Sequence, residues 1–131
     1  MKVLLVDDSV AIQQSFGSLL QTAPGVDVIG YAEDVASALA SIVTNPPDLI
    51  VLDAKLRGRD RGIEVLRYVR QHHSNIKVVV LSQFSWASVR NSHMDAGALA
   101  YFDMGLEFQQ ARDFIADLAI ARPAEAPELV S

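Results

Sequence analysis

The sequence predicts an α/β protein with a (βα)5 arrangement, in which five parallel strands form one doubly wound sheet. Two observations support this fold class. Short apolar segments alternate along the chain with amphipathic segments of helical period, as in consecutive βαβ units. The apolar runs at residues 3–6 and 49–52 are also continuous, which is typical of strands buried on both faces of a parallel sheet. A length of 131 residues suits a single domain.

The first half of the chain is expected to supply three strands and two helices. The strands are predicted at about residues 2–6, 26–31 and 49–52, where apolar and β-branched residues cluster. Ser9 is a favourable N-cap for the first helix, Pro24-Gly25 ends it, and Pro46-Pro47 forces a turn after the second helix. Apolar residues at helical spacing define the buried faces: Ile12, Phe16, Leu19 and Leu20 in the first helix, and Val35, Ala38, Leu39 and Ile42 in the second.

The second half is expected to contain strands at about residues 77–81 and 98–102, and three helices, the first of them preceded by Gly62. Residues at helical spacing are Ile63, Leu66 and Val69 in the first of these helices, Trp86, Val89 and His93 in the second, shorter one, and Phe108, Ala111, Ile115 and Leu118 in the last. Residues 1–121 therefore form the predicted domain. Residues 122–131 contain two prolines and no periodicity, so we expect a disordered or frayed C-terminal tail.

Composition excludes several classes of function. The formal net charge of -5 argues against direct nucleic-acid contact and against an anionic membrane surface, because both need clustered cations. The absence of cysteine excludes disulfides, zinc-thiolate sites and a cysteine nucleophile. No apolar segment approaches the roughly 20 residues that a membrane helix needs. We therefore expect a cytoplasmic protein.

Acidic residues follow two of the predicted strands. Asp7 and Asp8 come after the first strand, and Asp53 comes after the third. In a parallel sheet these carboxylates meet at one edge, where they repel each other unless a cation lies between them. Mg²⁺ favours such oxygen ligands and keeps positions for phosphate oxygens. The alternative is that these acids only cap the helices that follow.

With Asp7, Asp8 and Asp53, the sequence around Ser82 and Tyr101 completes a pattern that resembles the receiver domain of bacterial two-component response regulators. The resemblance covers about residues 2–120 and implies the flavodoxin-like strand order 2-1-3-4-5. It also implies that a histidine kinase or phosphotransfer protein phosphorylates Asp53 with Mg²⁺ as cofactor. Such receivers are signalling proteins and not enzymes.

The resemblance also assigns roles to individual residues. Asp7, Asp8, Asp53 and the main-chain carbonyl of Lys55 would hold Mg²⁺. The Ser82 hydroxyl would contact the phosphoryl group, although a serine at a strand end commonly bonds only nearby backbone. Tyr101 would be the aromatic switch, with an ordinary core position as its alternative.

Two departures from the family pattern concern cations. Met104 stands where most receivers have a lysine that bonds the phosphoryl group, so switch coupling is expected to be weakened. The loop from Lys55 to Arg61 carries three arginines, runs one residue longer than usual and has Arg57 where proline is common. We favour a solvated loop. The alternative is that Lys55 or Arg57 reaches the phosphoryl oxygens, or that the loop docks an acidic kinase surface.

Phe84 and Trp86, with Tyr101, are expected to form a face for a downstream protein or a homodimer, since aromatic residues often anchor interfaces. Core burial is the alternative for Trp86. We assign no chemistry to His72, His73 or His93.

The preferred interpretation is a stand-alone receiver that accepts a phosphoryl group and signals through protein contacts. The first alternative is an atypical receiver that acts as an adaptor or dimerisation module without phosphate. A phosphate-ester hydrolase with an Asp nucleophile is disfavoured, because the commonest such family has a second Asp where this chain has Lys55.

Overall fold

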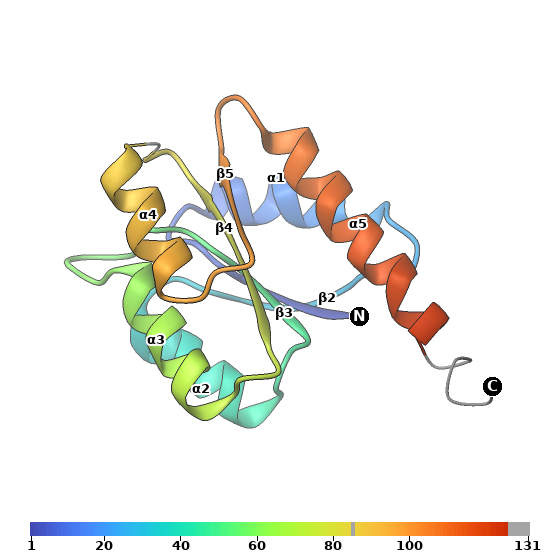
Figure 1. The fold of residues 1–131 in the computed structure, drawn as a ribbon, viewed down its shortest axis with the longest axis horizontal. Coiled ribbons are helices and arrows are strands. Elements are labelled where there is room, and N and C mark those ends of the chain that lie inside the picture. The colour runs from blue at the N-terminus through green and yellow to red at the C-terminus, as the bar shows by residue number, and fades with distance from the viewer. Residues whose placement is uncertain (85, 126–131) are drawn as a thin grey trace.

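The computed structural model describes residues 1–84 and 86–125, which form one sheet of five parallel strands between two layers of helices (Figure 1). The spatial order β2-β1-β3-β4-β5 confirms the predicted fold class and strand order. The direction of winding reverses between β1 and β3, which are neighbours in the sheet. The strands are β1 (Lys2–Val6), β2 (Asp27–Ala32), β3 (Leu49–Leu52), β4 (Lys77–Ser82) and β5 (Ala100–Asp103).

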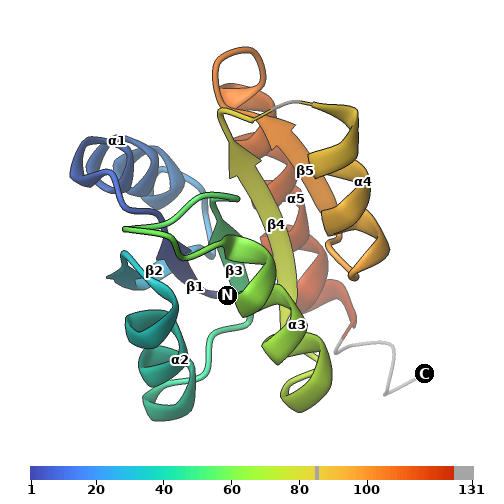
Figure 2. The same ribbon diagram turned by 90° about the vertical axis from the view of Figure 1, so that its left-hand side faces the viewer.

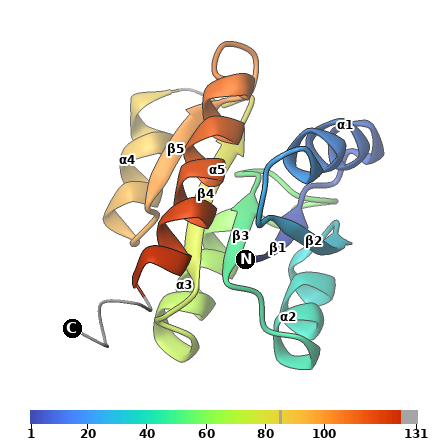
Figure 3. The same ribbon diagram turned by 90° about the vertical axis from the view of Figure 1, so that its right-hand side faces the viewer.

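Five helices cover the two faces of this sheet. They are α1 (Val10–Gln21), α2 (Val35–Thr44), α3 (Gly62–His72), α4 (Ala87–Asp95) and α5 (Phe108–Glu125). Helices α1 and α5 cover one face, while α2, α3 and α4 cover the other (Figures 2 and 3). No helix in the described part of the chain is both long and apolar enough to cross a lipid bilayer.

Strand β1 shows how the sequence divides the core between the two faces. Leu4 and Val6 belong to the apolar cluster under α2, α3 and α4, whereas Val3 and Leu5 belong to the cluster under α1 and α5. Successive side chains of a strand point to opposite faces, so a continuous apolar run supplies both clusters. The central strands are thereby fixed from two sides, which holds their carboxyl ends in place.

Capping determines where the first two helices begin. The Ser9 hydroxyl accepts a hydrogen bond from the backbone N–H of Ile12 at 3.2 Å, so the predicted cap of α1 is confirmed. Helix α2 begins with a capping box, in which Asp34 accepts from the backbone of Ser37 and the Ser37 hydroxyl accepts in return.

Three predicted boundaries differ from the structure. The segment before β5 closes α4, because the backbone N–H of Ala98 donates to the His93 carbonyl, and β5 begins only at Ala100. Trp86 precedes α4 as its N-cap, so the helix begins one residue later than predicted, at Ala87. Helix α5 runs to Glu125, so residues 122–125 of the predicted tail are helical. The remaining residues of that tail, 126–131, lie outside the described part of the chain.

Candidate functional site

Three Asp side chains meet at the carboxyl ends of β1 and β3. Val6 of β1 lies opposite Leu52 of β3, so both strands end at the same level. Asp7 and Asp8 follow the first strand and Asp53 the other, and one oxygen from each carboxyl group lies within 4.8 Å of the others. The predicted convergence of these carboxylates is therefore present.

Burial gives this cluster unusual protonation behaviour. The buried position of Asp7 raises its pKa from 3.8 to about 7, against the lowering effect of a hydrogen bond from the backbone N–H of Ser9, and the charges of Asp53 and Asp8 raise it further. Burial also raises the pKa of Asp53, while a hydrogen bond from the Ser82 side chain lowers it. Crowded negative charge and an all-oxygen donor set fit a hard divalent cation such as Mg²⁺.

Ser82 is fully buried at the end of β4 and serves two neighbours. Its side chain lowers the pKa of Asp53, and its hydroxyl oxygen accepts from the backbone N–H of Phe84 at 3.2 Å. The Ser82 hydroxyl thus bonds nearby backbone, which was the alternative prediction for this residue. It also lies close enough to Asp53 to affect the pKa of that carboxyl group.

Tyr101 of β5 is buried, and its hydroxyl donates to the main-chain carbonyl of Phe84. Its ring packs edge-on against His93, with centroids 5.6 Å apart, and the Arg90 guanidinium lies 5.1 Å from the ring centroid. Tyr101 therefore connects β5 to α4 and to the loop after β4. Its burial removes it from the exposed aromatic face to which the sequence assigned it.

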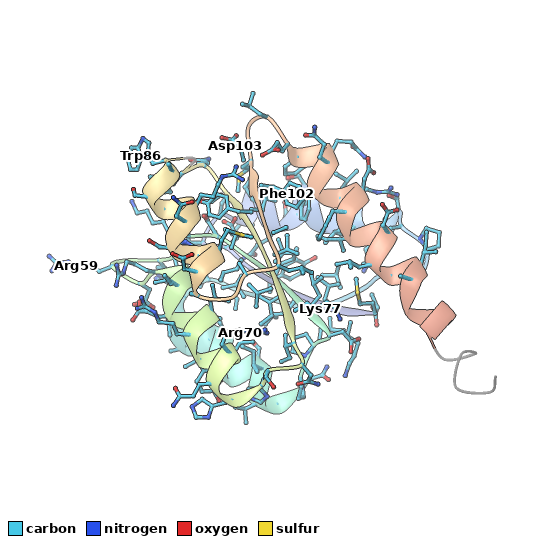
Figure 4. The ribbon with its side chains drawn as sticks, in the orientation of Figure 1. Arg59, Arg70, Lys77, Trp86, Phe102 and Asp103 are labelled. Carbon is cyan, nitrogen blue, oxygen red and sulfur yellow. The ribbon has the colours of Figure 1, made fainter. Side chains whose placement is uncertain are left out.

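The exposed part of that aromatic face consists of Phe84 and Trp86. Their ring centroids lie 5.7 Å apart, with Phe84 half-buried and Trp86 mostly exposed. Figure 4 shows Trp86 at the beginning of α4, pointing away from the sheet. The alternative of core burial for Trp86 is therefore wrong.

Met104 and Lys55 both lie near the acidic cluster. Both line a hollow that also contains Asp7, Asp8 and Asp53. Met104 is only 7% exposed and belongs to the apolar cluster under α1 and α5, so its side chain fills space where a lysine would bring a charge. Position 104 therefore carries no cation, and Met104 packs in the apolar core instead.

Lys55 is exposed, and its backbone N–H donates to Asp53 Oδ1 at 3.4 Å. Among the described residues it is the only cation that lines this hollow. Arg57, the alternative cation of the loop, instead forms an ion pair with Glu33 at the far side of the loop. Of the two cations, only Lys55 therefore lines the hollow at the cluster.

Gly62 is a structural requirement of the site that the sequence indicated only as a helix boundary. A Cβ atom at this position would lie 2.1 Å from the main-chain oxygen of Asp53. The backbone N–H of Gly62 donates to the Ala54 carbonyl at 2.9 Å, which holds the start of α3 against the end of β3. A glycine nine positions after Asp53 was the available signal, but this spacing does not reveal the close approach.

Residues 3–115 match the family described as the response regulator receiver domain. The chain belongs to this family. Receiver domains act in two-component systems, generally bind Mg²⁺ at a cluster of Asp residues, and interact with kinases or phosphotransfer proteins and with effector domains. The prediction of the family from the sequence is thereby confirmed.

Among curated relatives, this receiver is 32% identical over 130 residues to the transcriptional regulatory protein LiaR of Bacillus subtilis, covering 99% of the chain and 59% of LiaR. It is 35% identical over 81 residues to a protein-glutamate methylesterase/protein-glutamine glutaminase of Trichodesmium erythraeum, covering 62% of the chain and 23% of that protein. The chain thus spans less than two thirds of the length of LiaR and less than a quarter of the length of the second relative. A stand-alone protein without an output domain stays a prediction.

Two solved receiver structures have the same fold. The receiver domain of NtrX from Brucella abortus is 26% identical, with a TM-score of 0.77 and coverage of 91% of this chain and 98% of that one. A CheY-like receiver domain protein from Methanospirillum hungatei is 23% identical, with a TM-score of 0.80 and coverage of 95% and 97%.

Proposed function

We propose that this receiver accepts a phosphoryl group on Asp53 from a histidine kinase or phosphotransfer protein and transmits the signal through protein contacts. The observation that carries the proposal is the meeting of Asp7, Asp8 and Asp53 next to the buried Ser82 hydroxyl. A carboxylate held beside other acids is a poor helix cap but a good nucleophile once the surrounding charge is neutralised.

In the proposed reaction an Asp53 oxygen attacks phosphorus as the bond between phosphorus and the donor's imidazole nitrogen breaks. Mg²⁺ bound by Asp7, Asp8, Asp53 and the Lys55 carbonyl would neutralise charge on the transferring group. Asp7 must then be ionised, so it gives up the proton that burial favours. The Ser82 hydroxyl, already directed at Asp53, donates to a phosphoryl oxygen.

Intact-mass measurement tests the proposal directly. We expect incubation with Mg²⁺ and a small phosphodonor to add one phosphoryl group, and we expect the Asp53→Asn variant to add none. Chelation of Mg²⁺ should also suppress the addition. An unchanged mass in the wild type under all conditions would instead favour an adaptor that works without phosphate.

Lys55 is proposed to replace the missing lysine. We expect Lys55→Ala to change the rate of phosphorylation or the lifetime of phospho-Asp53 by about tenfold, roughly 1.4 kcal/mol. Arg59→Ala should have little effect, since Arg59 projects from the loop away from the sheet (Figure 4). Equal effects of both substitutions, measured by the decay of the phosphorylated mass, would indicate a diffuse electrostatic contribution from the loop.

Met104 is proposed to weaken the coupling between phosphorylation and the rest of the domain. A hydrogen bond from a charged group contributes about 1.5 to 3 kcal/mol, and an apolar side chain cannot provide it. We expect Met104→Lys to enlarge the amide shifts that a beryllium fluoride mimic causes at Phe84, Trp86 and Tyr101, because the lysine stem can stay in the core while its ammonium enters the hollow. Spectra that are identical for wild type and variant would show that coupling takes another route.

The second candidate is an adaptor or dimerisation module that needs no phosphate. The Tyr101 hydroxyl donates to the Phe84 carbonyl, and the exposed Trp86 ring lies 5.7 Å from the Phe84 ring. These observations support a partner face formed by Phe84 and Trp86. We propose this face for a downstream protein or a homodimer, with Tyr101 behind it and no direct nucleic-acid contact.

A further inference from the structure

A second hollow lies outside the acidic cluster, between the β3–α3 loop, α3 and α4. Its volume is about 430 Å³. Ile63 of α3, Val89 of α4 and Phe84 supply apolar walls, and His93 lies behind them. A space of this size with apolar walls can receive one large side chain and the backbone around it.

The rim of this hollow is basic although the chain as a whole is acidic. Lys55, Arg59 and Arg61 come from the loop and Arg67 comes from α3. None of these four forms an ion pair with any residue that the structure describes. The one acid of the rim, Asp60, accepts a hydrogen bond at 2.9 Å from the first backbone N–H of α2, so its charge is already engaged. Four cations therefore face solvent around an apolar space.

We propose that this hollow is a docking site for an acidic segment of a partner protein. One large apolar side chain of the segment enters between α3 and α4, and carboxylates on either side of it contact the rim. Charge complementarity selects the acidic chemistry, because an unpaired basic rim attracts anions and discriminates against cations. The exposed Trp86 ring beside Phe84 continues the apolar surface beyond the hollow, which suits a polypeptide better than a small anion.

Two residues connect this site to the acidic cluster. Lys55 and Phe84 line both hollows, so an occupant of one changes the surroundings of the other. His93, which lines the second hollow, also packs against Tyr101 of β5. Tyr101 in turn bonds the Phe84 carbonyl. Docking itself needs neither metal nor phosphate, so it is tested in their absence and its failure is separate from failure of phosphorylation at Asp53.

The experiment measures fluorescence anisotropy of three labelled peptides with the metal-free protein. The first carries a central Leu flanked by Glu, the second has Gln in place of each Glu, and the third has Ala in place of Leu. We expect the first to bind and the other two to bind at least about tenfold more weakly. Amide shifts of Ile63 and Val89 should accompany binding of the first peptide.

Matched variants locate the site. Arg59→Gln with Arg67→Gln removes two rim cations, and Lys2→Gln with Lys77→Gln removes two cations from the opposite end of the sheet. The rim variant should weaken binding about tenfold and the control less than about twofold, with equal melting temperatures. Equal binding of the Glu and Gln peptides, or equal losses in both variants, would overturn the proposal. Competition by inorganic pyrophosphate at the concentration of the peptide would assign the hollow to small anions instead.

Discussion

Replacing Gly62 by Ala should lower the free energy of unfolding by about 3 kcal/mol, which corresponds to a fall of about 10 °C in melting temperature for a domain of this size. The added Cβ would lie 2.1 Å from the Asp53 main-chain oxygen, which is rigid backbone and not the end of a flexible side chain. Either the end of β3 or the start of α3 must move. Because Asp53 moves with its backbone, we also expect phosphorylation to slow by more than about tenfold.

Gly30→Ala is the matched control for this variant. Gly30 lies in β2, its φ is not positive, and a Cβ there would meet only a Leu4 methyl group at an ordinary 3.6 Å. Its melting temperature should change little. If differential scanning calorimetry showed the same shift for both substitutions, the close approach at Gly62 would not be the cause.

The metal-free protein should become less stable as the pH rises from about 5 to about 8. In the folded protein Asp7 keeps its proton up to about pH 7, whereas in the unfolded chain it loses that proton near 3.8. The folded state therefore binds more protons in between, so stability falls with rising pH across this range and levels off above about 7. The pKa of Asp53 is raised too and acts in the same direction. At 1.36 kcal/mol per pH unit the loss is about 3 kcal/mol.

Mg²⁺ should reverse this loss, because the cation replaces the proton as the partner of the acidic cluster. Thermal melts at both pH values, with and without millimolar Mg²⁺, measure the effect. We expect clear stabilisation near pH 8, little near pH 5, and a much smaller response in Asp8→Asn, whose exposed carboxylate is one of the three that converge. Stabilisation by Mg²⁺ of equal size at both pH values would argue against proton competition at Asp7.

Elements with strong local signals were predictable from the sequence. Strands β1 and β3 have the predicted bounds because each is a continuous apolar run between charged or turn-forming residues. The start of α4 was predicted one residue too early because Trp86 lies at helical spacing from Val89 and His93, whereas it is the N-cap and its ring is in solvent. Helical period alone cannot distinguish a buried position from a cap that carries an aromatic side chain.

For the candidate site, the meeting of Asp7, Asp8 and Asp53 followed from topology, because parallel strands bring their carboxyl ends to one edge. The hydrogen bond from Tyr101 to the Phe84 carbonyl and the close approach at Gly62 did not follow. Both depend on how separate segments of the chain pack together, and the spacing of apolar residues in the sequence does not reveal such packing.

The residues of the candidate site come from two separate parts of the chain, one before and one after α3. The three carboxylates all precede residue 54 and come from the neighbouring strands β1 and β3, whereas Ser82, Tyr101 and Met104 come from or follow β4 and β5. A substitution in the later part can alter how strongly the domain responds while the charge cluster stays intact. Met104 illustrates this separation: it packs in the apolar cluster on the α1 and α5 side, so we expect a change at this position to leave the acidic cluster intact.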